Sequence, residues 1–260
     1  MNTQPIGVLD SGVGGLSIWR EIVRLVPHES TIYIGDSKNC PYGSKSEDEI
    51  YTLAKRLVQT LLDKNCKLIV LACNTITVSC LDRLRRDFKA VPIIGVVPVV
   101  KTAAEQSRNG RIGILSTSKT AQSQYQRDLI NRFAQISTVT NLGTDRLVPF
   151  IEAGKTEGIE EVLTEVLEPF KKENIDVLAL GCSHFPFLKA EMKKILGKNV
   201  EILDSGLAIA RQVKRVLESR DELCDKFKPN YIFFTTGDKS LFSKVLRSVG
   251  NNNRVEQIEI

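Results

Sequence analysis

The chain has 260 residues, of which 42% are hydrophobic and 26% charged, and its formal net charge is +5. This composition is typical of a folded globular protein with room for two domains, and it excludes fibrous and intrinsically disordered classes. No apolar run reaches the ~18 residues that a membrane span needs. Nothing resembles a zinc finger, an RNA-binding signature or a secretory signal, so we expect a cytoplasmic protein without nucleic-acid or membrane partners.

Short apolar runs alternate with amphipathic stretches along the whole chain. The apolar runs predict strands at Ile6–Leu9, Thr31–Ile34, Leu68–Ala72, Ile93–Val96, Ile112–Leu115, Ile136–Thr140, Val177–Leu180, Val200–Leu203 and Ile232–Thr235. The amphipathic stretches predict helices near 15–26, 47–63, 76–88, 98–107, 120–132, 157–173, 187–196, 206–219 and 239–248. Alternation with fully apolar strands is typical of α/β folds in which helices cover both faces of mostly parallel sheets.

Two distant segments share one pattern, in which an apolar strand ends in a cysteine followed by a small polar residue. They read KLIVLACNTITV (67–78) and DVLALGCSHFPF (176–187). This repeat predicts two similar, pseudo-symmetric α/β domains with the active site in the cleft between them. We expect residues 1–97 and 207–260 to form a discontinuous first domain and residues 98–206 the second, because the last segment has no counterpart in the second half.

A glycine-rich turn, Asp10-Ser11-Gly12-Val13-Gly14-Gly15, directly follows the first strand. Its glycines would let the backbone approach a ligand at a helix N-terminus, or the turn would only connect strand and helix with Asp10 or Ser11 as N-cap. Both interpretations stay open. A dinucleotide site needs a third glycine where Ser17 stands, and no Walker-type lysine follows.

A second loop, Cys40–Ser46, leaves a strand through Pro41 and Gly43 and enters a helix for which Ser46 and Glu49 have capping-box spacing. Turn chemistry alone explains the proline and the glycine. Loops at this rim of a parallel sheet also contact ligands, however.

The paired cysteines point to proton transfer at carbon. Cys73 is expected at a helix entrance, where the helix dipole lowers a thiol pKa from about 8.5. His184 stands next to Cys182 and could exchange protons with it or orient it. A Cys–His pair also suits a thiol hydrolase, but that alternative leaves the second cysteine unexplained. Two thiols on opposite faces could remove and return a proton. We expect Cys66, Cys80 and Cys224 to be free packing residues.

Taken in order, the motifs resemble those of the glutamate racemases, within the cofactor-independent aspartate/glutamate racemase superfamily. The matching stretches are GVLDSGVGGLS (7–17), YIGDSKNCPYGSKS (33–46), LACNTITV (71–78), LVPFIEAG (147–154) and LGCSHFP (180–186). The resemblance implies interconversion of L- and D-glutamate, with D-glutamate supplied for bacterial peptidoglycan. It further implies a homodimer that needs neither a cofactor nor a metal.

The resemblance also implies roles for particular residues. Cys73 and Cys182 would be the two acid/base catalysts, Asp10 and His184 would assist them, and Glu152 would lie close to the site. The substrate-binding residues would be Asp10, Ser11, Tyr42, Gly43, Asn74, Thr75, Ser183 and His184.

The chain departs from the family pattern at a few positions. Ser183 stands where threonine is usual and Phe185 where tyrosine is usual, and Gly143–Arg146 replaces an Ala-Cys-Pro segment. Cys40 is a third thiol that we expect to be non-catalytic.

Three alternatives remain: an aspartate racemase, a non-catalytic binding protein and a nucleotide-dependent enzyme that uses Gly12–Gly15. One methylene separates glutamate from aspartate, and an apolar contact of that size is worth about 1–3 kcal/mol.

Overall fold

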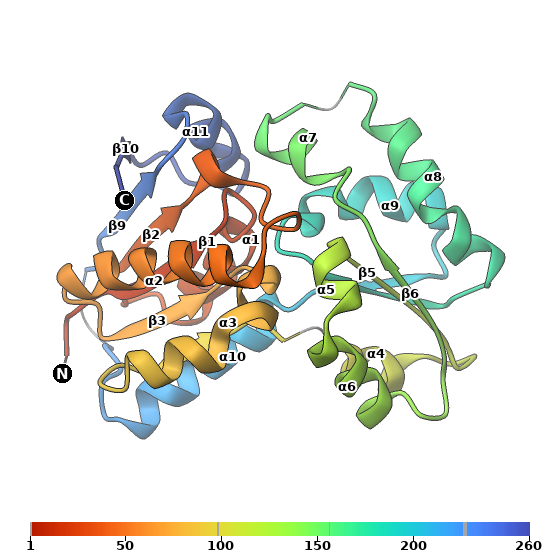
Figure 1. Cartoon of the computed structure of the whole chain (residues 1–260), viewed down its shortest axis with the longest axis horizontal. Helices are drawn as coiled ribbons and strands as arrows, with labels where there is room; N and C mark the ends of the chain where they lie inside the picture. Colours follow the sequence, from red (N-terminus) through yellow and green to blue (C-terminus); the bar gives the residue numbers. More distant parts are fainter. Residues whose placement is uncertain (1, 98, 156, 226–227) are drawn as a thin grey trace.

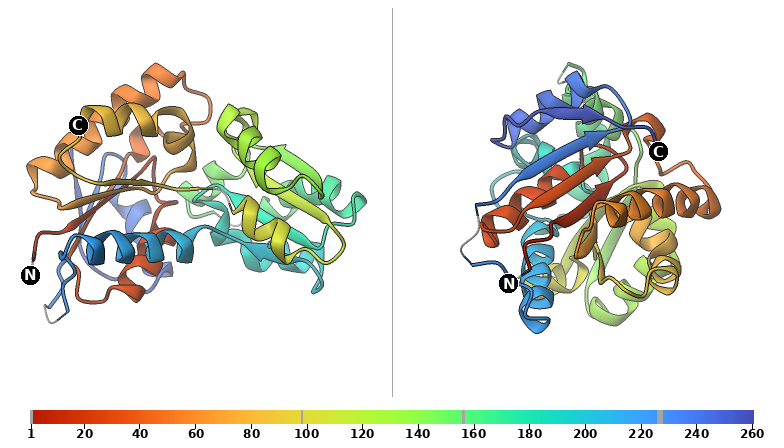
Figure 2. Two further views of the ribbon diagram at one scale, coloured as in Figure 1. Left: turned by 90° about the horizontal axis from the view of Figure 1, so that it is seen from below. Right: turned by 90° about the vertical axis from the view of Figure 1, so that its left-hand side faces the viewer.

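The computed structural model describes residues 2–97, 99–155, 157–225 and 228–260. It forms two lobes side by side, with both ends of the chain in the first lobe (Figures 1 and 2). None of the helices in these residues is both long and apolar enough to cross a membrane.

The first lobe contains a parallel sheet in the order β10-β9-β2-β1-β3-β4. Its strands are β1 (Ile6–Asp10), β2 (Thr31–Gly35), β3 (Leu68–Leu71), β4 (Ile93–Gly95), β9 (Tyr231–Thr235) and β10 (Val255–Gln257). Residues from the C-terminal part of the chain thus return to the sheet that begins with β1.

Helices cover both faces of this sheet because alternate strand residues point to opposite sides. Val8 and Val70 belong to one apolar cluster with helices α1 (Leu16–Leu25), α10 (Gly206–Ser219) and α11 (Lys239–Ser248). Leu9 and Leu71 belong to another with α2 (Glu47–Asp63) and α3 (Asn74–Asp87). The predicted capping box starts α2: the Ser46 hydroxyl accepts from Glu49 N, and the Glu49 carboxylate accepts from Ser46 N.

The second lobe contains a parallel sheet in the order β6-β5-β7-β8. Its strands are β5 (Arg111–Ser116), β6 (Thr138–Gly143), β7 (Val177–Gly181) and β8 (Glu201–Leu203). Its helices are α4 (Val100–Gln106), α5 (Ser118–Gln122), α6 (Gln124–Phe133), α7 (Val148–Glu152), α8 (Ile159–Lys172) and α9 (Lys189–Leu196). Two short 3₁₀ turns, η1 (Ser37–Asn39) and η2 (Phe185–Leu188), complete the described elements.

The two sheets repeat one arrangement. The strands β2-β1-β3-β4 and β6-β5-β7-β8 have the same order, and the predicted fold of two similar α/β units with parallel sheets is confirmed. The domain limits stay a prediction, and the limit at residue 98 falls outside the described residues. In each unit, polar residues follow the carboxyl ends of the two central strands, where ligands of open α/β sheets bind.

Several predicted elements differ from the structure. The helix expected at 120–132 is two helices, because Ser123 ends α5 and its hydroxyl then caps α6 by accepting from Gln126 N. The strand expected at 136–140 begins at Thr138 and reaches Gly143. Helix α7 and strand β10 were not predicted, since α7 has less than two helical turns and β10 contains a single apolar residue, Val255. The helix expected from 98 begins at Val100 in the described residues.

Candidate active site

The two cysteines of the sequence repeat meet at one cavity. Cys73 follows β3 as the N-cap of α3, Cys182 follows β7, and their exposed fractions are 4% and 5%. The cavity draws its walls from both lobes: Ser11, Cys40, Pro41, Tyr42, Gly43, Cys73, Asn74, Thr75, Thr117, Val148, Cys182, Ser183 and His184. Its volume is about 10 Å³, which is room for about one water, so the lobes are closed around it.

Cys73 is buried despite its place at a helix entrance. Its sulfur lies 3.5 Å from the Ser11 hydroxyl. Burial, followed by the negative charge of Asp10, raises the pKa of the Cys73 thiol to about 12. The expectation of a lowered pKa is therefore wrong for the closed cavity, because loss of hydration outweighs the helix dipole. Cys73 is a protonated thiol here.

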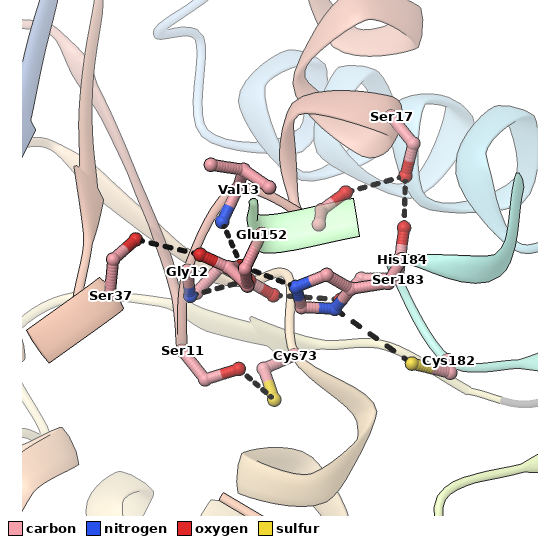
Figure 3. A network of polar contacts seen from close by, with 12 residues as sticks. Ser11, Gly12, Val13, Ser17, Ser37, Cys73, Glu152, Cys182, Ser183 and His184 are labelled. Carbon is pink, nitrogen blue, oxygen red and sulfur yellow. Dashed lines mark hydrogen bonds and ion pairs between the residues drawn. The ribbon is translucent and has the colours of Figure 1, made fainter. Parts of the chain in front are cut away.

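A polar chain leads away from Cys182 (Figure 3). The Cys182 sulfur lies 3.9 Å from His184 Nδ1, and His184 Nε2 lies 2.6 Å from Glu152 Oε1. Glu152 is itself held, since its carboxylate accepts from Val13 N at 2.7 Å and from the Ser37 hydroxyl at 3.0 Å. Glu152 therefore contacts the imidazole of His184 rather than the sulfur of Cys182.

His184 is positively charged in this arrangement. Burial opposes the charged form, but contacts with Cys182, Cys40 and Glu152 together raise the pKa of His184 well above its usual value. The positive charge of His184 thus lies next to the Cys182 sulfur.

Asp10 ends β1 and is completely buried. Its carboxylate accepts from Gly12 N at 2.9 Å and from the Ser183 hydroxyl at 2.9 Å, so it ties the first lobe to the second. Burial raises the pKa of Asp10, and the neighbouring charge of His184 counteracts this.

The glycine-rich turn brings the two lobes together. A Cβ atom at Gly14 would overlap the His184 ring, and one at Gly12 would overlap the Glu152 carboxylate. The N–H groups of Gly12 and Val13 already donate to Asp10 and Glu152. Neither Asp10 nor Ser11 is the N-cap of α1, because that position is Gly15. The turn therefore lets the first lobe approach Glu152 and His184 closely, and the N–H groups of Gly12 and Val13 are not free to bind a phosphate.

The remaining predicted binding residues line the cavity with different partners. Asn74 has a buried Nδ2 without a hydrogen-bond partner among the described residues, so it has a free donor. The Thr75 hydroxyl lies 3.0 Å from that of Thr117. The Tyr42 hydroxyl donates to Asp36 at 2.6 Å, which leaves its ring and backbone to face the cavity.

Sequence reasoning missed several wall residues, including Thr117 and Val148. Thr117 follows β5 as Ser11 follows β1, so the repeat itself could have indicated it. Near the cavity, Asp145 has a buried Oδ1 without a hydrogen-bond partner in the described residues, and a Cβ at Gly43 would overlap it.

In the described part of the chain, Cys40, Glu152 and His184 offer metal-type ligand atoms within 4.8 Å of one another.

Comparisons with known proteins agree with this geometry. Residues 6–213 match the family model described as Asp/Glu/Hydantoin racemase. The glutamate racemase of Clostridium botulinum is 38% identical over 97% of this chain and 95% of its own length. The crystal structure of a Bacillus anthracis glutamate racemase isoform superposes with a TM-score of 0.91 at 34% identity, covering 100% of this chain and 99% of the other. The structure of an Escherichia coli glutamate racemase, solved with L-glutamate and the activator UDP-MurNAc-Ala, superposes with a TM-score of 0.88 at 35% identity and covers 98% of both chains.

Proposed function

We infer the activity from the premise that this chain belongs to the Asp/Glu/Hydantoin racemase family, and we propose that it interconverts L- and D-glutamate. The predicted enzyme class, an isomerase of this family, is confirmed by relatives such as the Clostridium botulinum protein. Glutamate as substrate is supported by the names of these relatives and by the L-glutamate bound to the Escherichia coli protein.

The mechanism we propose uses Cys73 and Cys182 as the two proton carriers. A thiolate on one face of the α-carbon takes the α-proton, and the electron pair stays on carbon. The thiol on the other face gives its proton to that carbon and becomes the thiolate. The pair thus exchanges roles in each turnover. The observation that carries this proposal is that both sulfurs, from equivalent strand ends, line one cavity.

The other residues support these two in the proposed mechanism. Asn74, with its unpaired amide donor, and the hydroxyl groups of Ser11 and Thr75 would bind carboxylates of the substrate. Asp10 and Ser183 would face its ammonium group. That ammonium brings positive charge towards Cys73 and so favours its thiolate against the cost of burial. His184, whose pKa is raised in part by Glu152, would supply the positive charge next to Cys182.

Optical activity tests the proposed reaction. Purified protein, dialysed and supplied with L-glutamate in thiol-protecting buffer without added cofactor or nucleotide, should bring the circular dichroism signal to zero. Solvent deuterium should enter the α-position at the same time. Turnover of aspartate but not glutamate would discard the assigned specificity. Folded protein that turns over neither would favour a binding protein, and a requirement for nucleotide would favour the third alternative.

Alanine at either catalytic cysteine tests the two-thiol mechanism. Cys73→Ala and Cys182→Ala should each lower racemisation by about 10²–10⁴-fold or more, because each step loses its acid or its base. Both variants should fold and bind glutamate. Cys80→Ala is the matched control, since that thiol donates to Ile76 O within helix α3. Near-normal turnover by either catalytic-cysteine variant would refute the mechanism.

A role in supplying D-glutamate for peptidoglycan is the biological proposal that follows. Expression of the chain should restore growth of a bacterium that requires D-glutamate, and the Cys73→Ala variant should not. The homodimer and the cytoplasmic location stay predictions of the sequence, and light scattering of the purified protein would test the former.

A further inference from the structure

Cys40 is a thiol at the site for which the proposed reaction has no use. It lies on the loop before Pro41 and lines the catalytic cavity. It also lines a separate groove of about 310 Å³ between α7 and α11, to which Glu152 contributes as well. Cys40 and Glu152 are both partly exposed. Cys40 therefore stands in the wall between the groove and the cavity.

Three ligand atoms of different chemistry converge at this wall. The Cys40 sulfur, a His184 ring nitrogen and a Glu152 carboxylate oxygen all lie within 4.8 Å of one another. Tetrahedral zinc with bond lengths near 2.0–2.3 Å needs separations of roughly 3.4–3.6 Å between such ligands. Small shifts suffice to reach them: the sulfur moves inward, and the contact of 2.6 Å between His184 and Glu152 opens to admit the ion.

The surroundings suit a cation of intermediate softness. Thiolate, imidazole and carboxylate together select zinc or cobalt, whereas magnesium and calcium prefer an all-oxygen set. Two anionic ligands and one neutral imidazole balance a divalent charge, which suits a site this buried. Glu152 is already oriented by Val13 N and Ser37, as metal-binding carboxylates usually are.

We propose that Cys40, Glu152 and His184 form a binding site for a thiophilic divalent cation such as Zn²⁺, and that its occupancy stops racemisation. The ion reaches the site through the groove and displaces two protons to the solvent, one from the Cys40 thiol and one from the His184 ring nitrogen that then binds the metal. Cys40 and His184 also line the catalytic cavity, so the bound ion fixes both side chains in its wall and blocks the space in which the substrate would bind. The inhibitory half of this proposal rests on the proposed racemase mechanism, and the binding half does not.

Cobalt titration measures the binding directly. The whole chain, reduced with a phosphine that does not bind metals strongly, should take up one equivalent of CoCl₂. The spectrum should show visible bands of tetrahedral cobalt and a thiolate-to-cobalt band in the near ultraviolet. ZnCl₂ should displace both. Cys40→Ala should lose the thiolate band and bind Zn²⁺ about tenfold more weakly or worse. Cys80→Ala, the same change outside the site, should behave as the unmodified protein.

Inhibition is measured in parallel, with each protein's rate expressed relative to its own rate without metal. ZnCl₂ should stop the unmodified protein and Cys80→Ala at concentrations that leave Cys40→Ala active. If Cys40→Ala does not fold, Cys40→Ser replaces it, because it keeps the side-chain size and loses the thiolate ligand.

Either of two results would overturn the site. One is a folded protein that binds no cobalt. The other is a Cys40→Ala variant with an unchanged thiolate band and unchanged inhibition, which would place the ion on Cys73 and Cys182. A normal cobalt spectrum in a protein that racemises nothing would instead contradict the proposed function and leave the metal site standing.

Discussion

His184 is the residue through which the two lobes act on one sulfur. One of its ring nitrogens faces Cys182 and the other faces Glu152, and Gly14 of the first lobe leaves the space that the ring fills. The Ser17 hydroxyl donates to Ser183 O at 2.8 Å and fixes the backbone next to it. The charge on this imidazole thus depends on contacts from both lobes.

Glu152→Gln tests that dependence. The pKa of His184 is raised, so its charge is present at low pH and is lost as pH rises through that value. Glutamine keeps the shape and can still accept from Val13 N, but it removes the negative charge that helps to raise this pKa. The alkaline limit of the pH profile of kcat/KM should therefore move to lower pH, with a smaller loss of activity at low pH.

The contribution of charged His184 to the stability of the folded protein also decreases as pH rises. It is fully present below the pKa of unfolded histidine, about 6.5, and is lost as pH rises through the folded value. Glu105→Gln, at a surface ion pair with Lys101, is the control for a lost carboxylate. A Glu152→Gln profile that superposes on the unmodified one would show that Glu152 does not set the charge of His184.

At the level of the secondary-structure elements, the cavity and a buried ion pair lie at opposite ends of the first sheet. Ser11 and Cys73, which line the cavity, follow the carboxyl ends of β1 and β3. Before β3, Lys67 Nζ pairs with Glu29 at 2.8 Å, and each side chain is 1% exposed. Lys67 also donates to Asn2 O and Glu222 O, both at 2.7 Å. This buried pair therefore joins four separate segments of the chain away from the cavity.

Lys67→Met should destabilise the protein by about 3–5 kcal/mol, because Glu29 is left buried without its partner. Lys67→Met combined with Glu29→Leu should recover much of this loss, since no charge is then buried. Urea unfolding gives both values. Lys55→Met, at the exposed pair with Asp87, should cost about 0–1 kcal/mol. Equal losses of unfolding free energy in Lys67→Met and Lys55→Met would contradict this division of roles, as would loss of activity in folded Lys67→Met.

At the scale of the whole molecule, the C-terminal part of the chain completes the first lobe. Trp19, the single tryptophan, packs edge-on against Tyr231 and Phe233 of β9, with ring centroids 5.5 and 5.0 Å apart. Strand β9 pairs with β2, and the side chain of Thr236, just beyond it, donates to Asp36 at 2.6 Å. Asp36 in turn holds Tyr42 at the cavity, so the last strands also position the site.

Removal of residues 229–260 should therefore unfold the first lobe, because β2 loses its neighbour and the Trp19 ring loses its apolar cover. Trp19 fluorescence should shift to the red, as in denaturant, and racemisation should disappear. A shorter truncation after Ile258 keeps β10 and should leave both properties unchanged. Native fluorescence in the longer truncation would mean that the first lobe folds without β9.

The class of fold was predictable from the amino-acid sequence alone. Strand and helix periods follow from local patterns of apolar residues, and the repeated strand–cysteine segment indicated two equivalent units with one thiol each. The predicted capping box at Ser46 needed only neighbours three residues away. Helix α7 and strand β10 were not recognised, because α7 has less than two helical turns and β10 contains a single apolar residue, Val255.

The surroundings of the cysteine and histidine side chains depend on contacts between segments that are distant in the sequence. Burial raises the pKa of the Cys73 thiol, against the local expectation from its helix entrance, because segments distant in sequence remove its water. The contact between Glu152 and His184 and the position of Cys40 next to both also join distant segments. Local sequence fixes backbone periods and residue types, whereas hydration and charge at a site depend on every segment that closes over it.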